Sequence, residues 1–259
     1  MRGPRGNWGP RIETHIMHAS KTDDENHPLG PVLTPRSALG PDREDTLEFG
    51  TRHLRIRRPT NTQDLLDHPD IHNAFAADEY LPYWPELWPA SRMLAAYLAE
   101  NNNLPLAPHE SARGIELGCG LGLPGLMAMV RGFRVTFTDY DALALEYALA
   151  NAKLNGLSGA DALFLDWRKP PEGLKFPLVL GSDLLYEPGK VGPLARIVEN
   201  LLAPGGVALI SDPDRGPAKR FASELYQCGL AHCELIRTSL IEPDGQTIRG
   251  TIYRVERSL

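Results

Sequence analysis

The sequence contains few cysteines and no long hydrophobic run. Its 259 residues include three cysteines, an odd and widely spaced set that fits neither a disulfide framework nor a paired zinc motif. No apolar run approaches the roughly 20 residues that a membrane-spanning helix needs, so no membrane contact is expected. No apolar block follows the basic N-terminus, so a secretory signal is not predicted. These absences favour a reduced, cytoplasmic protein.

Positive charge and metal-binding motifs are also scarce. The formal net charge is -6, which disfavours a protein that wraps nucleic acid through its overall field. None of the eight histidines is spaced with another ligand as in a metal site, so we predict no metal. The hydrophobic fraction of 42% is ordinary for a globular protein and supplies a sizeable core.

Residues 1–46 are expected to form a disordered tail, in which Met17 is an alternative start. Glycine, proline and charged residues are dense there and apolar residues follow no period, so burial would not offset the entropy cost of ordering. We divide the rest into an N-terminal extension packed on the core, over residues 47–110, and a core domain over 111–259. We expect a monomer.

The extension predicts two strands, a helix and a rigid aromatic loop. Apolar and polar residues alternate around Gly50 within 47–58, which indicates two short strands. The arginines of this stretch form either a solvated strand face or a basic rim for an acidic partner. A helical pattern begins near residue 61. A loop with two tryptophans and three prolines over 81–89 then leads into a helix over 90–100.

The remaining sequence alternates strands and helices. This alternation predicts a Rossmann-like α/β fold, with a seven-stranded, mostly parallel sheet, helices on both faces and an antiparallel C-terminal strand. The turn before the last strand is short, which requires antiparallel pairing there. The expected strands are 115–117, 135–138, 162–165, 178–182, 207–211, 232–239 and 248–255, and the expected helices are 123–131, 142–155, 192–202 and 217–228.

A glycine-rich loop directly after the first core strand is the strongest local signal. It reads Glu116-Leu117-Gly118-Cys119-Gly120-Leu121-Gly122, and Asp139 ends the next strand, where a carboxylate suits a ribose hydroxyl pair. The spacing differs from the dinucleotide fingerprint, and Glu116 would repel a pyrophosphate. Glu116 suits a ligand that carries an ammonium group, bound directly or through water.

With these motifs the chain resembles the seven-β-strand (class I) S-adenosylmethionine-dependent methyltransferases, and among them the family-16 protein-lysine methyltransferases. The resemblance covers about residues 47–257. It rests on Leu87-Trp88-Pro89, the glycine loop, Asp139, Asp166-Trp167 after the third strand, and Ser182-Asp183-Leu184-Leu185-Tyr186 after the fourth.

The resemblance implies S-adenosylmethionine as cofactor and assigns residues to it. Trp88 and the loop residues would contact its methionine part, Asp139 its ribose, and Trp167 its adenine. The implied cofactor-binding set, with Glu116 from the residues themselves, is Trp88, Glu116, Gly118, Cys119, Gly120, Asp139, Asp166, Trp167 and Ser182. The D-x-x-Y element is typical of lysine-modifying members. Asp183 would therefore capture the acceptor amine, and the Tyr186 ring would pack against the alkyl stem of the acceptor lysine.

Simpler structural roles exist for several of these residues. Trp167 could be a core aromatic, Trp84 and Trp88 a packing staple, Asp183 a helix cap and Tyr186 a half-buried phenol. The extra Trp84 leaves open which tryptophan touches the cofactor. Asp212-Pro213-Asp214-Arg215 after the fifth strand has no family counterpart, and a solvated turn explains it most simply.

The function that follows is N-methylation of a lysine side chain of a protein substrate. A small-amine methyltransferase and a non-catalytic cofactor-binding regulatory module are the alternatives. An open acidic cleft would favour the protein lysine, and a closed pocket the small amine. Nucleic acid is the least favoured acceptor, because no Asn-Pro-Pro-Tyr type element for a flipped base follows the fourth strand.

Overall fold

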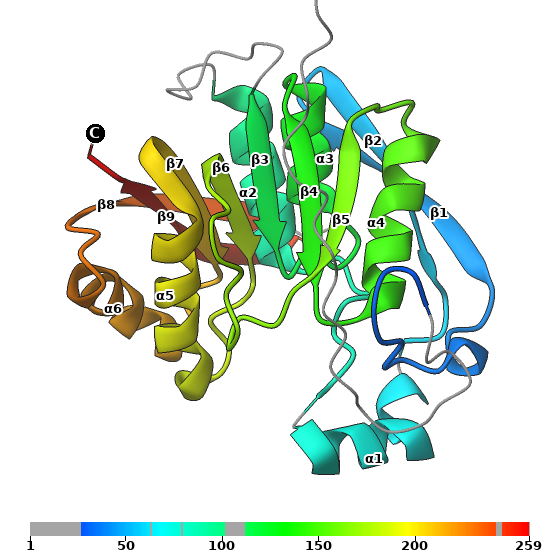
Figure 1. Cartoon of the computed structure of the whole chain (residues 1–259). Coiled ribbons are helices and arrows are strands. Elements are labelled where there is room, and N and C mark those ends of the chain that lie inside the picture. Colours follow the sequence, from blue (N-terminus) through cyan, green and yellow to red (C-terminus); the bar gives the residue numbers. More distant parts are fainter. Residues whose placement is uncertain (1–26, 63, 79, 102–111, 242–244, 259) are drawn as a thin grey trace, which may run out of the picture.

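A single seven-stranded sheet forms the centre of the structure (Figure 1). This computed structural model describes residues 27–62, 64–78, 80–101, 112–241 and 245–258. The sheet order is β5-β4-β3-β6-β7-β9-β8, with only β9 antiparallel to its neighbours. The predicted fold class is therefore confirmed. The strands are β3 Arg113–Leu117, β4 Arg134–Asp139, β5 Ala160–Phe164, β6 Phe176–Ser182, β7 Leu202–Asp212, β8 His232–Ile241 and β9 Thr247–Glu256.

Helices cover both faces of this sheet, because successive side chains of a strand point to opposite faces. Leu178 and Leu180 of β6 pack into the core on one face of the sheet, whereas Val179 packs into the core on the opposite face. The central strands are almost continuously apolar, as expected for strands buried on both sides. The helices are α2 Pro89–Glu100, α3 Leu123–Val130 and α4 Ala142–Leu154 on one face, and α5 Val191–Leu201 and α6 Phe221–Gln227 on the other.

A two-stranded hairpin packs outside α4. Strands β1 (Asp42–Phe49) and β2 (Arg52–Pro59) pair antiparallel, so the two predicted strands are present and longer than expected. Asn151 of α4 accepts from the backbone N–H of Arg57 at 2.7 Å and so fastens β2 to the core. Arg55, Arg57 and Arg58 of β2 pair with the acids Glu44, Asp45 and Glu86, which supports the solvated-face interpretation over the basic rim.

The short helix α1 (Pro69–Asp78) follows the 3-10 turn η2 (Asp64–Asp67) and lies near the carboxyl ends of the central strands (Figure 1). Three further 3-10 turns are η1 Arg36–Ala38, η3 Pro188–Lys190 and η4 Pro217–Arg220. No helix in the described ranges is long and apolar enough to cross a bilayer. The boundary proposed near residue 111 between extension and core lies outside the described residues, and the division stays a proposal.

The expected disordered tail is wrong for residues 27–46. Strand β1 begins at Asp42, and Thr34 is fully buried. The Asp141 carboxylate accepts from the Thr34 N–H at 3.0 Å and from the Thr34 hydroxyl at 2.5 Å. Hydrogen bonds and a few buried apolar side chains without a regular period, such as Ala38 and Leu39, order this segment, so composition gave no sign of it. Residues 1–26 lie outside the described residues.

The buried Thr34 hydroxyl provides a test of this packing. It donates to Asp141 and accepts from Trp84 Nε1 at 2.9 Å, so Thr34→Val leaves both groups short of a partner. We expect the free energy of unfolding to fall by about 1–3 kcal/mol in urea denaturation. Thr46→Val, at an exposed position of β1, is the matched control and should change little. Equal stability of the two variants would contradict the buried contact.

Candidate active site

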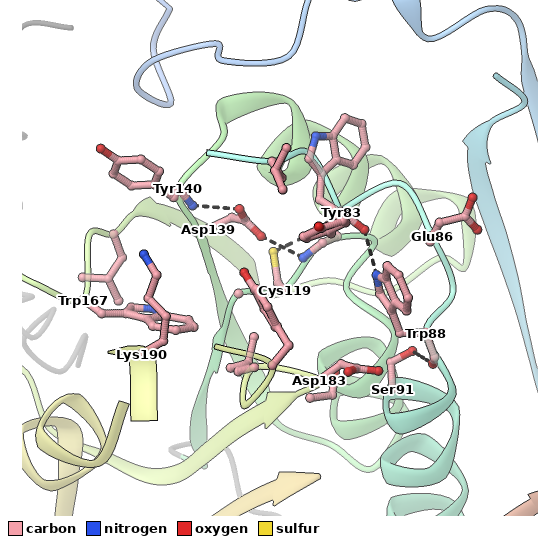
Figure 2. A pocket seen from close by; sticks show the side chains of 18 of the residues that line it. Tyr83, Glu86, Trp88, Ser91, Cys119, Asp139, Tyr140, Trp167, Asp183 and Lys190 are labelled. Atoms are coloured by element: carbon pink, nitrogen blue, oxygen red, sulfur yellow. Dashed lines mark hydrogen bonds between the residues drawn. The ribbon is translucent and has the colours of Figure 1, made fainter. Parts of the chain in front are cut away.

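A pocket opens at the carboxyl ends of β3, β4 and β6, where the strand order reverses. In open α/β sheets this switch point is the usual ligand site. Figure 2 shows its side chains, with Tyr140 and Trp167 toward one end and Trp88, Ser91 and Asp183 toward the other. The wall is built from the aromatic loop 80–91, the glycine loop 118–121 and the segments that follow β4, β5 and β6.

The glycine loop turns sharply between β3 and α3. Gly118 and Gly120 have φ values of 53° and 50°, in the left-handed region that residues other than glycine rarely adopt. A Cβ at Gly118 would lie 2.7 Å from Leu184 Cδ2, so the loop is also closely packed from below. The Cys119 N–H donates to the Thr138 carbonyl at 2.8 Å, which ties the loop to the end of β4.

Glu116 does not lie where the sequence led us to expect it. It is fully buried, it is not part of the pocket wall, and its Oε2 accepts from the Gly125 N–H of α3 at 2.9 Å. Burial raises the pKa of its carboxyl well above the usual range. Glu116 points into the strand–helix interface and holds the start of α3 against β3. In this position Glu116 does not line the pocket directly, and its contact with a ligand ammonium through water stays a prediction, since its Oε1 has no hydrogen-bond partner among the described residues.

Asp139 occupies the end of β4 beside the glycine loop. Its Oδ2 accepts from the Gly120 N–H at 2.9 Å, and its Oδ1 accepts from the Tyr140 N–H at 2.7 Å (Figure 2). Burial raises the pKa of Asp139 to about 6, although these N–H groups act in the opposite direction. The carboxylate is thus fixed in place with lone pairs left for donors from the pocket.

Flat aromatic surfaces lie near Asp139. Trp167 follows β5, lines the pocket and also packs against the core. It is therefore both a core aromatic and a pocket residue, the two roles that the sequence suggested. Tyr140 stacks obliquely on Phe164 with ring centroids 5.3 Å apart, and the Arg168 guanidinium lies 5.3 Å from the Tyr140 ring centre. Asp166 accepts from the Arg168 side chain at 2.8 Å and also lines the pocket.

The two loop tryptophans differ in their surroundings. Trp84 is only 7% exposed, and its ring packs on Tyr147. Trp88 is more exposed, donates from Nε1 to the Tyr83 carbonyl at 2.8 Å and meets the Tyr83 ring edge to face. Both touch the pocket. The packing-staple interpretation therefore suits Trp84, while Trp88 belongs to the wall next to Asp183 (Figure 2).

Asp141 holds the aromatic loop over the pocket, a role that sequence reasoning missed. The Tyr80 hydroxyl donates to it at 2.6 Å, Thr34 binds it, and it caps α4 by accepting from the Leu143 N–H at 2.9 Å. Burial raises the pKa of the Asp141 carboxyl. An acid directly before a helical pattern is the only signal in the sequence, and it predicts a cap without the long-range partners.

Asp183 and Tyr186 meet the pocket just beyond β6. Asp183 has a φ of 61° and a side chain only 4% exposed, and its N–H donates to the Ser211 carbonyl at 2.9 Å. No helix begins at Asp183, since η3 starts at Pro188, so helix capping does not explain it. Tyr186 is 39% exposed and packs edge to face on Tyr83, with ring centroids 5.7 Å apart. Ser182 also lies on the wall.

The sheet order and the switch-point pocket define a class I methyltransferase fold. A crystal structure of an S-adenosylmethionine-dependent methyltransferase from Methanosarcina mazei superposes with a TM-score of 0.51 at 16% identity, covering 61% of this chain and 98% of that one. Residues 84–226 match the family model described as lysine methyltransferase, so the chain belongs to that family.

Curated relatives agree with this assignment and differ in the residue they modify. A histidine protein methyltransferase 1 homolog of Dictyostelium discoideum is 32% identical over 47% of this chain and 40% of its own length. Protein N-lysine methyltransferase METTL21A of Danio rerio is 33% identical over 54% and 66%, respectively. Histone-arginine methyltransferase METTL23 of Xenopus laevis is 33% identical over 41% and 46%. The matched region spans less than two thirds of these relatives.

The fold and the family imply S-adenosylmethionine as cofactor, and the residues present fit it. The pocket offers a fixed carboxylate at Asp139 for the ribose, the flat face of Trp167 for the adenine, and a glycine loop with which a ligand can make close backbone contact. Trp88 and Ser182 lie on the wall toward Asp183. The roles of the individual residues stay predictions.

Asp139 predicts a pH dependence of cofactor binding. Two ribose hydroxyl donors favour the ionised carboxylate, so binding should lower the pKa from about 6, and affinity should fall as pH drops below that value. We expect S-adenosylhomocysteine to bind up to about tenfold more weakly at pH 5 than at pH 7.5, by calorimetry. Asp139→Asn should weaken binding by about 1.5–3 kcal/mol and flatten the pH dependence. A variant with unaltered affinity would remove Asp139 from the ribose site.

The tryptophans allow a paired comparison. Trp84→Phe removes the bond to Thr34 and should lower the free energy of unfolding by about 1–3 kcal/mol, with little effect on S-adenosylhomocysteine binding. Trp88→Ala should weaken that binding by about 1 kcal/mol and destabilise the fold less. Both quantities come from denaturation and calorimetry on the same preparations. If Trp84→Phe mainly weakened binding and Trp88→Ala mainly lowered the free energy of unfolding, the roles assigned to the two tryptophans would have to be exchanged.

Proposed function

We propose that this protein is an S-adenosylmethionine-dependent methyltransferase that N-methylates a lysine side chain of a protein substrate. The observation that carries the acceptor assignment is Asp183, a buried carboxylate on the pocket wall whose Oδ2 has no hydrogen-bond partner among the described residues. Leaving such an atom unpaired costs free energy, and an N–H donor from an acceptor amine would satisfy it.

The aromatic mouth beside Asp183 suits an alkyl ammonium. Tyr83, Trp88 and Tyr186 pack edge to face in series, which leaves ring faces and edges around the entrance. Aromatic faces attract a cation and pack well against a methylene stem. Burial raises the pKa of Tyr186 above its ordinary value, so its phenol stays neutral. This arrangement matches a lysine side chain entering from the surface.

The shape of the entrance favours a protein acceptor over a small amine. Tyr186 remains 39% exposed, and the pocket wall extends to the rim at Glu86 and Glu187, which are paired with Arg58 and Lys190, respectively. A residue presented by a folded partner can reach such an opening. The small-amine and regulatory-module alternatives lack a comparable observation. A monomer located in the cytoplasm that does not act on nucleic acid remains our expectation.

Methyl transfer requires alignment more than acid–base catalysis. When bound, S-adenosylmethionine supplies an electrophilic methyl group on a cationic sulfur. The protein has to hold the acceptor nitrogen within near-attack distance and exclude water, and Asp183 with the aromatic mouth performs both tasks. The lysine must also lose a proton, which costs roughly 4–5 kcal/mol at pH 7 from an unperturbed pKa of about 10.4. A dry pocket lowers this cost.

The acceptor assignment is tested by Asp183→Asn. Purified protein is incubated with methyl-labelled cofactor and an extract of its own cells, and labelled species are identified by mass spectrometry. We expect methyl-lysine in protein, at least about tenfold less of it with Asp183→Asn, and an S-adenosylhomocysteine affinity within about twofold of wild type.

Asp161→Asn, which removes an exposed acid on β5, is the matched control and should label like wild type. Three outcomes would contradict the proposal. Full labelling by Asp183→Asn would remove this residue from the acceptor site. Label found only in small metabolites would favour the small-amine alternative, and label on histidine or arginine would reassign the acceptor to the residue types named for two of the relatives.

A further inference from the structure

An arginine from the turn after β7 reaches the acceptor end of the pocket. Arg215 Nη1 is in ion-pair contact with Asp183 Oδ1, and its guanidinium carbon lies 6.0 Å from the centre of the Trp88 ring. The Arg215 side chain is 29% exposed, so it is largely covered by its neighbours. The simple interpretation of Asp212-Pro213-Asp214-Arg215 as a solvated turn therefore does not hold for Arg215.

The turn is built to project this side chain. The buried Asp212 accepts from the Arg215 N–H at 2.6 Å through Oδ1, and its Oδ2 lies 3.8 Å from Arg215 Nη1. Asp214 has a φ of 59°, and its carboxylate is held by Arg237 at 3.1 Å and by the Thr251 hydroxyl at 2.5 Å. Strands β8 and β9 thus fix the turn from the far side, and Arg215 is left facing Asp183.

The charge of Asp183 presents a conflict for lysine methylation. A lone carboxylate beside the acceptor captures an ammonium well, but it also stabilises the protonated form that cannot attack. A cation on the same carboxylate reduces this effect while leaving the second oxygen free to accept one hydrogen bond. Among the described residues neither Asp183 oxygen has a hydrogen-bond partner, and Oδ2 is the one that the ion-pair contact of Arg215 Nη1 with Oδ1 leaves open to the amine.

We propose that Arg215 is a positioning residue that offsets the charge of Asp183, so that the acceptor amine is bound through Oδ2 without being held as the ammonium. This inference rests on the proposed lysine acceptor at Asp183. Loss of Arg215 is therefore expected to tighten the binding of an alkyl ammonium, whereas loss of a residue with a merely structural role would weaken it.

The charges around Asp183 define the expected order of affinities. Asp183, Arg215 and Asp212 sum to -1 when all are ionised, so Arg215→Gln gives -2 and Asp183→Asn gives 0. Burial raises the pKa of Asp212 to about 6, so it is ionised at pH 7.5 and above. Asp214 is paired with Arg237, and burial raises the pKa of Tyr186 above its ordinary value, so the Tyr186 phenol stays neutral from pH 7.5 to 9.

The test uses n-butylamine, labelled with carbon-13 next to nitrogen, as a lysine side-chain probe in complex with protein and S-adenosylhomocysteine. Affinity at pH 7.5 and the pKa of the bound amine are measured by NMR. We expect Arg215→Gln to bind the probe at least about fivefold more tightly than wild type and to raise the bound-amine pKa. Asp183→Asn should bind it at least about fivefold more weakly, and the double variant should fall between the two single variants.

Three controls separate charge from folding. Arg215→Lys keeps the cation and should restore wild-type affinity and amine pKa. Arg215→Met is a second neutral variant that keeps an alkyl stem over Trp88 and should behave like Arg215→Gln. Arg220→Gln removes an exposed arginine five residues away, paired with Glu224, and should leave both readouts unchanged. S-adenosylhomocysteine affinity and the thermal midpoint verify that each variant is folded.

Probe affinity and amine pKa in the Asp183 and Arg215 variants separate the role of Arg215 from the acceptor site itself. If Asp183→Asn weakens probe binding but neither neutral Arg215 variant tightens it or raises the amine pKa, the role of Arg215 is overturned and the acceptor site stands. If Asp183→Asn binds the probe like wild type, the acceptor site at Asp183 and the role of Arg215 both fail.

Discussion

The buried carboxylate of Asp141 is the constraint on which the pocket depends. It joins three stretches that are far apart in the chain: the segment around Thr34, the aromatic loop at Tyr80, and the first turn of α4. Its bond with Tyr80 ties the start of the loop that carries Trp84 and Trp88 to α4. Burying a charge is unfavourable unless hydrogen bonds replace water, and Asp141 receives several of them. The site is therefore assembled by a polar contact lying within the core.

Three acids near strand ends illustrate how surroundings decide what the same functional group does. Glu116 faces a helix start and serves the fold, Asp139 receives backbone N–H groups and faces the pocket, and Asp183 accepts no hydrogen bond from the described residues while Arg215 contacts its Oδ1. Only the last two line the pocket. Glu116 and Asp139 point to the same face of the sheet, and they differ because Glu116 lies within β3 against the start of α3, whereas Asp139 is the last residue of β4.

Sequence patterns predicted the sheet and most of the pocket because both depend on local features. Apolar strands, helical periodicity and the glycine turn are readable within windows of a few residues, and they predicted Asp139 beside the glycine loop, whereas the site roles of Trp167 and Asp183 were implied by the family resemblance. The orientation of Glu116 was missed because its contact with Gly125 of α3 decides it. The order at residues 27–46 and the reach of Arg215 were missed because each depends on partners about 30 to 110 residues away. Such contacts leave no local periodicity.

The left-handed backbone of Asp183 and Asp214 restricts how this corner of the protein can vary. A side chain at such a φ costs roughly 1–2 kcal/mol for most residues, and aspartate and asparagine, after glycine, tolerate it best. Asp183 is the ion-pair partner of Arg215, and Asp214 directly precedes Arg215 in the chain. Replacement by a larger or branched residue would move the backbone as well as change the chemistry. Acceptor preference in this scaffold can therefore diverge more readily through Arg215 and the aromatic mouth, where the backbone is ordinary and a single side chain can be exchanged without moving its neighbours.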